Sequence, residues 1–393
     1  MTLVHEEVYV EDLLKELQRL GWMFDRELSG YRSDFIEWKD FKPVFEKING
    51  LSNFDPRDAK EILDHVKDFL SKKDARSILD ALRNGLSYKI RGKSLKLGFI
   101  SYDKVDSNNF KVARKPRFPG KTVDSEPDLV LYVNGIPLVL IEVKSPAKVG
   151  ALEEALIQIN RYEAESPDLF RFVQLAIAYV GRGDSVYRPT LPNYKSDRRF
   201  IPYSRWRSEN NEYNILDLLR PERILEIIKW YTFFKEGEED KIVARYVQYH
   251  ASERAYKLIR DYIEGVSDKN RGLIWHWQGS GKSYTMFFIA YRFFRTFFDR
   301  DPVVFFIVDR RELAEQLHKE FIDKLHARGF KEYVAVIGSI EELKQVLRQI
   351  SESERSGRSI KRGVYITLIQ KFRAEDLADI DPIEKREILL LID

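Results

Sequence analysis

The chain has 393 residues, enough for about two or three domains, and 44% of its residues are hydrophobic, which is typical of globular proteins. Its formal net charge of +3 is too small to indicate a partner, so any nucleic-acid surface must come from local basic clusters. The sequence has no cysteine, which excludes disulfides and cysteine-ligated metal sites, and its 6 scattered histidines argue against a histidine-based metal cluster.

The first part of the chain, residues 1–90, is predicted to be mainly helical. Leucines recur at helix spacing and a glycine follows them: Leu13, Leu14, Leu17, Leu20 and Gly21. Glu11 precedes the leucines, where its negative charge would favour the N-terminus of a helix.

Residues 108–122 form a basic segment with the features of an extended chain. Its cationic residues are Lys111, Arg114, Lys115, Arg117 and Lys121. Such a run either binds phosphates, with an affinity that depends strongly on salt, or is a solvated face. We expect these five residues to bind DNA, an interpretation that depends on the hairpin that follows them.

The stretch from Glu126 to Ser145 predicts a β-hairpin, because two apolar, β-branched runs flank Asn134-Gly135. Three charged residues lie at its open end: Asp128, Glu142 and Lys144. Glu142 and Lys144 are two residues apart, so on a strand they point to the same face.

The orientation of Asp128 depends on the turn of this hairpin. A two-residue Asn134-Gly135 turn would pair Asp128 with Ile141 and point it away from Glu142. A three-residue turn over 133–135, with Gly135 in a G1 bulge, would bring Asp128 to the face of Glu142. We favour the bulged form, because two carboxylates and an ammonium group on one apolar sheet need a chemical reason.

The chemistry that fits these residues is phosphodiester hydrolysis. Asp128 and Glu142 would hold Mg²⁺, which prefers oxygen ligands and keeps several waters. The metal would lower the pKa of a bound water and bind the oxygens of the scissile phosphate. Lys144 would position the attacking water and offset the charge that develops on the phosphate. The structural alternative is a surface hairpin with a solvated end, since Glu-x-Lys alone is common.

Asp128 followed by Glu142-Val143-Lys144 resembles the PD-(D/E)xK nuclease motif, and residues 127–146 are similar to the nuclease domain of the restriction subunit of type I restriction enzymes. Gln158 and Tyr162 match the Gln-x-x-x-Tyr that follows the active site in that branch. Their spacing puts both on one helix face. The resemblance implies that they face the metal site and the DNA; without it, a packed Tyr and a solvated Gln would be expected. Some relatives also place an N-terminal helical glutamate near the metal, which is a second interpretation of Glu11.

Beyond the hairpin we expect a helix over 150–165 and a strand over 174–180 that closes the nuclease sheet. The stretch 181–207 is rich in Gly, Pro and Arg and long for a loop, so it is either functional or mobile. One or two helices are expected over 214–234. A polar linker after residue 234 marks the predicted boundary between a first domain, 1–235, and a second domain, 236–393.

The second domain begins with a nucleotide-binding pattern. Residues 272–277 are a candidate buried strand, followed by Gln278-Gly-Ser-Gly-Lys-Ser and a long helix, the context that a P-loop requires. The backbone of Gly279, Ser280 and Gly281 would approach phosphates at the helix N-terminus. Lys282 would bind the β- and γ-phosphates of ATP, and Ser283 would ligate Mg²⁺. His276 replaces the first glycine of the general pattern, although the form resembles that of type I restriction subunits.

The remaining sequence alternates between strands and helices, as α/β domains do. Strands are expected at 303–308, 334–337, 364–368 and 388–392, with helices over 311–325 and from Ile340. This part resembles the first RecA-like domain of superfamily 2 motors, in which Gln248 would read adenine. Asp393, at the end of an apolar strand, resembles the start of a Walker B motif and would help to hold Mg²⁺.

The predicted fold class is therefore α/β: a PD-(D/E)xK nuclease domain with a mixed sheet, followed by a first RecA-like domain that is cut off at Walker B. The sequence looks like an N-terminal fragment that lacks the second motor domain, so we expect neither translocation nor appreciable ATP hydrolysis from it. The apolar stretch 284–298 is interrupted by Arg292 and Arg295 and has no membrane-spanning length, and no signal peptide is evident. We expect a cytoplasmic protein.

The resemblance implies an Mg²⁺- and ATP-using restriction subunit that acts on double-stranded DNA together with methyltransferase and specificity subunits. A repair-type helicase–nuclease acting on free DNA ends is a second hypothesis, because Gln-x-x-x-Tyr occurs there too. A third is a non-catalytic docking module. The clustered charges of Asp128, Glu142 and Lys144 argue against the third, since an idle site has no need of them.

Overall fold

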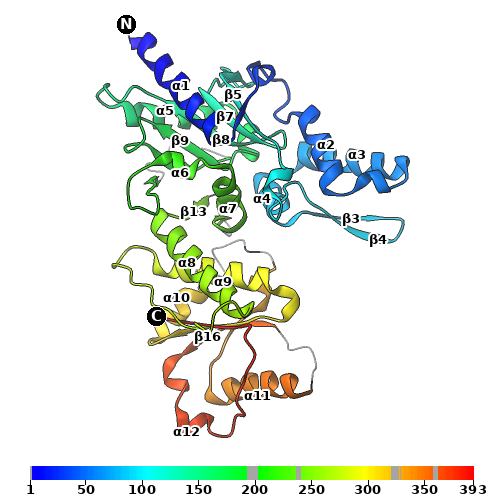
Figure 1. The fold of residues 1–393 in the computed structure, drawn as a ribbon, viewed down its shortest axis with the longest axis vertical. Coiled ribbons are helices and arrows are strands. Elements are labelled where there is room, and N and C mark those ends of the chain that lie inside the picture. The colour runs from blue at the N-terminus through cyan, green and yellow to red at the C-terminus, as the bar shows by residue number, and fades with distance from the viewer. Residues whose placement is uncertain (1, 193–201, 236–239, 320–326, 328, 357–361) are drawn as a thin grey trace. The chain divides into compact units, whose positions relative to one another are not determined.

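The structure is a computed structural model that describes residues 2–192, 202–235, 240–319, 327, 329–356 and 362–393. The chain divides into two compact units (Figure 1). The first unit comprises Met1–Thr232 and Glu239–Tyr246, and the second comprises Phe233–Glu238 and Val247–Asp393. The single domain boundary predicted after residue 235 stays a prediction.

A seven-stranded mixed sheet forms the centre of the first unit. In spatial order its strands are β1 (Met23–Phe24), β5 (Phe110–Arg114), β7 (Leu129–Val133), β8 (Ile136–Val143), β9 (Leu175–Tyr179), β10 (Val186–Pro189) and β11 (Ser204–Arg205). The pairs β1–β5 and β8–β9 are parallel, and the other neighbours are antiparallel. The mixed sheet agrees with the predicted fold class.

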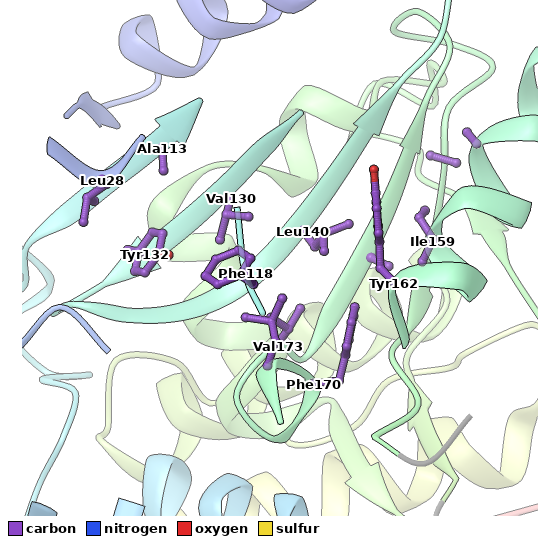
Figure 2. Packing of buried hydrophobic residues seen from close by; sticks show 14 of the residues in the cluster. Leu28, Ala113, Phe118, Val130, Tyr132, Leu140, Ile159, Tyr162, Phe170 and Val173 are labelled. Atoms are coloured by element: carbon purple, nitrogen blue, oxygen red, sulfur yellow. The ribbon is translucent and has the colours of Figure 1, made fainter. Parts of the chain in front are cut away.

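The central strands are buried on both faces, which explains their nearly continuous apolar sequences. Every residue of β7, β8 and β9 is buried. Helix α5 (Ala151–Glu165) connects the parallel strands β8 and β9 and packs on the sheet, as Figure 2 shows for Val130 and Leu140 with Ile159. Side chains alternate along a strand, so Asp128 and Glu142 belong to the same face as Val130 and Leu140, the face that α5 covers.

Residues 2–107 contain the predicted helices, and also strands that the sequence analysis missed. The helices are α1 (Thr2–Arg19), α2 (Trp38–Ile48), α3 (Pro56–Lys72) and α4 (Ala75–Asn84). Asp55 and Asp74 cap α3 and α4 by accepting hydrogen bonds from backbone N–H groups. The missed strands are β1, β2 (Gly30–Tyr31, parallel to β6, Pro116–Arg117) and the antiparallel hairpin of β3 (Leu86–Ile90) and β4 (Lys93–Leu97).

The remaining elements of the first unit and the chain between the units are short. They are α6 (Ile215–Leu218), α7 (Pro221–Trp230), β12 (Thr232–Phe234) and β13 (Lys241–Val243). The two helices lie within 214–234, as predicted, but the last residues of that range form the strand β12.

The second unit contains a four-stranded parallel sheet with helices, as the alternation in the sequence predicts. Its strand order is β15 (Val334–Val336), β16 (Gly363–Leu368), β14 (Val303–Val308) and β17 (Ile388–Ile392). Its helices are α8 (Tyr246–Ile263, which begins at the end of the first unit), α9 (Lys282–Thr296), α10 (Arg311–His318), α11 (Ile340–Ser356) and α12 (Ala374–Leu377). The part of the predicted helix 311–325 beyond residue 319 lies outside the described residues. Among the described helices of both units, none has the length and apolarity needed to cross a membrane.

The prediction of a buried strand over 272–277 is wrong. These residues form no regular element, and Leu273 and Trp275 are 92% and 88% exposed. The strand order of the described sheet ends at β17, which pairs only with β14. The prediction rested on the apolar sequence of this segment, which indicates burial. A strand also needs a neighbouring strand as hydrogen-bonding partner, and among the described residues this segment has none.

Candidate functional site

The hairpin of β7 and β8 brings Asp128 opposite Glu142, although not through the turn that we predicted. Asn134 and Gly135 both have positive φ, 51° and 76°, and form a two-residue turn that pairs Val133 with Ile136. The predicted three-residue turn with a G1 bulge at Gly135 is therefore wrong. The register shifts farther along the hairpin instead, where Tyr132 pairs with Pro137 but Leu131 pairs with Val139.

The extra residue is Leu138, and its neighbour Pro137 explains the position of the irregularity. Proline has no backbone N–H to donate to a ladder and is found at bulges. The Leu138 carbonyl accepts a hydrogen bond from the N–H of Gln174 on the other side of β8 (2.8 Å). Since Leu129 pairs with Ile141, the preceding Asp128 lies at the level of Glu142. A bulge inside β8 thus gives the alignment that we had assigned to the turn.

Two carboxylates lie at the open end of this hairpin, Asp128 partly buried and Glu142 buried. The Asp128 Oδ2 atom accepts a hydrogen bond from the backbone N–H of Val143 (2.8 Å). Burial raises the pKa of Asp128 above its ordinary value despite this bond. Glu142 is only 3% exposed. Burial, together with the negative charge of Asp128, raises the pKa of Glu142 to about 7.

Lys144 is the cation of this site. Its Nζ atom donates a hydrogen bond to Oε1 of Glu142 (2.7 Å), and the residue is 8% exposed. Burial disfavours the charged ammonium, but the negative charge of Glu142, with those of Asp128 and Glu6, outweighs burial and raises the pKa of Lys144. Lys144 therefore stays positively charged and neutralises only one of the two carboxylates.

Gln158 and Tyr162 from α5 complete the arrangement around Glu142. Gln158 donates from Nε2 to the Tyr162 hydroxyl (2.9 Å). That hydroxyl lies 3.0 Å from Oε2 of Glu142 and 2.8 Å from the carbonyl of Glu126, and its single proton can be donated to either. Burial raises the pKa of Tyr162, so the phenol stays protonated. The structure thus brings together all five residues that we predicted to be catalytic.

The sequence analysis missed Glu6, which lies near this site. Its Oε2 atom is 3.9 Å from Nζ of Lys144. Glu11, the glutamate that we considered, lies in the middle of α1 and forms an ion pair with Arg114 (2.8 Å). The helix begins at Thr2 and not near Glu11, so Glu11 does not act at a helix N-terminus. The signal for Glu6 was its helix spacing from the buried Val10, which continues the leucine pattern towards the N-terminus.

The basic segment 108–122 is largely neutralised within the protein. Lys111 contacts Asp25 and Asp40 (2.7 Å each). Arg114 contacts Glu7 (2.5 Å) and Glu11, Lys115 also contacts Glu7, and Arg117 contacts Asp124 (3.2 Å). Lys121 is exposed and its backbone N–H donates to the Glu165 carbonyl (2.8 Å). The five residues do not form one free cationic surface, and their role in DNA binding stays a prediction.

In the second unit, the residues of the predicted P-loop lie at the start of α9. Gln278–Ser280 form a turn, and Gly279 and Gly281 have φ values of 78° and 86°, which glycine adopts most readily. The helix begins at Lys282, followed by Ser283. Backbone N–H groups at a helix N-terminus, next to a lysine and a hydroxyl, suit a phosphate with its Mg²⁺.

Gln248 and Asp393 both contact this loop region. Gln248 on α8 donates from Nε2 to the backbone carbonyls of Ser280 and Gly281 (3.4 and 3.3 Å). Asp393 follows β17, and its Oδ1 atom is 3.9 Å from Nζ of Lys282. The backbone N–H of Asp393 donates to the carbonyl of Ile307 on β14 (3.0 Å), which fixes its position at the end of the sheet. The predicted nucleotide-binding residues therefore converge on one end of α9.

Comparison with known proteins gives two family matches. Residues 4–196 match the family described as type I restriction enzyme R protein N terminus, and residues 247–393 match the family described as SWI2/SNF2 ATPase. The first match contains every residue of the Asp128–Glu142 site, and the second contains every residue of the loop at α9.

Three relatives extend over most of the chain. A putative type I restriction enzyme MjaVIIIP endonuclease subunit from Methanocaldococcus jannaschii is 38% identical over 98% of this chain and 39% of the relative. The putative MjaVIIP endonuclease subunit from the same organism is 41% identical over 76% of this chain and 29% of the relative. The type I restriction enzyme HindI endonuclease subunit from Haemophilus influenzae is 25% identical over 97% of this chain and 38% of the relative. The chain thus spans between 29% and 39% of the length of these relatives.

Proposed function

Because the chain belongs to the family of type I restriction enzyme R proteins, we propose that it contains the Mg²⁺-dependent DNA endonuclease site of such a subunit, joined to part of its ATP-driven motor. The observation that carries this proposal is the pair of the partly buried Asp128 and the buried Glu142, with Lys144 beside it. Two acids with raised pKa values and one cation leave a negative charge that a divalent cation would neutralise.

The donor set fits Mg²⁺ and argues against a metal with protein ligands alone. Among the described residues, no group of three or more Asp, Glu, His or Cys side chains could hold a metal. Asp128 and Glu142 would therefore be the only carboxylate ligands, and Mg²⁺ commonly keeps waters in the remaining positions. When bound, the ion would lower the pKa of a water and polarise the scissile phosphate.

The other residues of the site have roles that follow from their contacts. Tyr162 and Gln158 form a chain of hydrogen bonds that fixes the Oε2 atom of Glu142. If Glu142 held the metal, the ammonium group of Lys144 would be available to orient the attacking water and to stabilise charge on the phosphate. Glu142, Lys144 and Tyr162 are buried, so little reorganisation of these three groups would be needed during the reaction.

In the second unit we propose an ATP site. The backbone of 279–281 and Lys282 would bind the phosphates, while Ser283 and Asp393 would hold Mg²⁺. Gln248 bonds the loop carbonyls through its Nε2 atom, and its Oε1 atom, as an acceptor, matches an adenine amino group. By analogy with the family we propose double-stranded DNA as substrate, methyltransferase and specificity subunits as partners, and the cytoplasm as location.

Cleavage of supercoiled circular DNA with Mg²⁺, by the chain and by Glu142→Ala, tests the nuclease proposal. We expect nicking that the variant lacks. Calorimetry adds a readout that needs no turnover: Mg²⁺ or Mn²⁺ should bind the wild type and bind Glu142→Ala at least tenfold more weakly. Equal metal binding by both proteins, or nicking that survives the substitution, would refute the assignment of the site.

A further inference from the structure

The hairpin of β3 and β4, which precedes the candidate nuclease residues in the chain, has an unusual charge. Residues 86–97 contain four Lys or Arg and no Asp or Glu: Lys89, Arg91, Lys93 and Lys96. In the whole chain, 66 cationic residues are balanced by 63 acidic ones. Arg91 and Gly92, with φ values of 47° and 79°, form its tight two-residue turn. Figure 1 shows the hairpin as a narrow projection beside α3.

The two faces of this hairpin differ in their contacts. Tyr88 lies on the inner face, where its ring stacks on His65 (4.3 Å between centroids) and its hydroxyl donates to Glu61 (2.6 Å). Ile90 and Leu97, on the same face, are buried. The pairs Ser87–Lys96 and Lys89–Ser94 lie on the outer face, and all four residues are exposed. The hairpin is therefore fixed by one face and presents the other to solvent.

The lysines of the hairpin differ from the cations of the segment 108–122 in their ion pairs. In the described part of the chain, Lys89, Lys93 and Lys96 form no ion pair, and only Arg91 at the tip is paired, with Asp58 (2.7 Å). Adjacent like charges slightly destabilise the folded hairpin, so an anion that neutralises them would stabilise it.

The spacing of the charges fits a nucleic-acid backbone. Lys89 and Lys96 are diagonal neighbours across the strand pair, which puts them about 7–8 Å apart. Because the backbone of duplex DNA winds around the helix axis, neighbouring phosphates of one strand are farther apart than their ~3.4 Å axial spacing, so two such lysines can reach neighbouring phosphates. The hydroxyls of Ser87 and Ser94 stand beside the lysines, and serine is a common donor to phosphate oxygens.

We propose that the outer face of this hairpin, formed by Ser87, Lys89, Ser94 and Lys96, binds the phosphate backbone of duplex DNA. This inference rests on the proposed function, since it takes DNA as the substrate. The helices that carry the hairpin contact the sheet at the turn of β7 and β8, where the Glu37 N–H donates to the Gly135 carbonyl (2.8 Å). Glu142 lies near the other end of β8, roughly 20 Å away along the strand. The hairpin is thus a site that holds DNA at a distance from the cleavage site.

The test is duplex binding by the whole chain, measured by fluorescence anisotropy of a labelled 30-base-pair duplex in EDTA, at several KCl concentrations. The variant Lys89→Gln/Lys96→Gln removes two contacts, so the slope of log affinity against log salt should become shallower by about 1.8. Lys89→Arg/Lys96→Arg should keep the wild-type slope. Lys15→Gln/Lys72→Gln is a matched control that removes the same charge from lysines already paired with Asp12 and Asp68.

An unchanged slope in Lys89→Gln/Lys96→Gln, an equal change in the matched control, or no duplex binding by the wild type would each overturn the inference. Polyglutamate of the same total charge should compete less well than unlabelled duplex. Equal competition would mean that the face binds any polyanion and would also overturn the inference. The proposed nuclease function fails on a different result, the absence of Glu142-dependent metal binding. The four substituted lysines are exposed or lie in surface ion pairs, so equal melting temperatures are expected for all variants.

Discussion

Replacing Glu142 by Gln should stabilise the metal-free protein at high pH and leave its stability at low pH nearly unchanged. Burial raises the pKa of Glu142 from its ordinary 4.5 to about 7. Between these two values the folded state holds a proton that the unfolded state has released, so stability falls as the pH rises. At about 1.36 kcal/mol for each pH unit, the loss amounts to about 3 kcal/mol above pH 7. The glutamine side chain of the variant cannot ionise, which removes this loss.

Urea denaturation of wild type and Glu142→Gln in EDTA, from pH 4.5 to pH 8, measures this difference. The stability gained by the variant should grow across that range to about 3 kcal/mol and then level off. Glu153→Gln, on the exposed side of α5, is a control that should show no such growth. A gain that is independent of pH, or a variant less stable than the wild type at pH 8, would refute the assignment of a strained, buried carboxylate.

Three further predictions concern single contacts. Tyr162→Phe removes the hydrogen bond to Glu142, and calorimetry should show metal binding about 5- to 10-fold weaker, with little change in melting temperature. Gln248→Ala should weaken ATP binding about 5- to 10-fold in equilibrium dialysis and leave affinity for inorganic triphosphate nearly unchanged, because the adenine contact is lost. Gly135→Ala places a Cβ against the Glu37 carbonyl, far inside contact distance, at a residue with positive φ. Urea denaturation should show a free energy of unfolding lower by at least about 2 kcal/mol. A decrease below about 0.5 kcal/mol, the size of an ordinary surface change, would contradict this.

The apolar strands of the two sheets and the proximity of the candidate site residues could be predicted because their signals are local. The apolar run 303–308 is a strand with the same limits in the structure, and Gln158 and Tyr162 lie four residues apart on α5, both near Glu142. Their spacing and the chemistry of their side chains contain the information needed. Local sequence also contained the cause of the bulge, since Pro137 stands next to Leu138, but we placed the bulge at Gly135 in order to bring Asp128 to the face of Glu142.

What the sequence analysis missed depends on partners that are distant in the chain. Glu6 lies near Lys144 because α1 packs beside β8; its helix spacing from Val10 places it on one face of α1, but the sequence does not indicate what that face contacts. The cations Lys111 and Arg114 looked like a DNA-binding run, because their acidic partners lie more than 70 residues earlier in the sequence. The segment 272–277 shows the opposite error, since its apolar sequence was taken as burial and Trp275 is exposed.

The predicted and the missed features together explain why the candidate nuclease site is where it is. A strand buried on both faces should carry apolar residues only, and β8 follows this rule from Ile136 to Ile141. Glu142 breaks it, with a pKa of about 7 that reflects an uncompensated cost of burial. Lys144 and Tyr162 offset part of that cost, and a divalent cation would offset the rest. Sites where a local rule fails without an internal compensation are expected to be functional, and that argument applies to the end of β8.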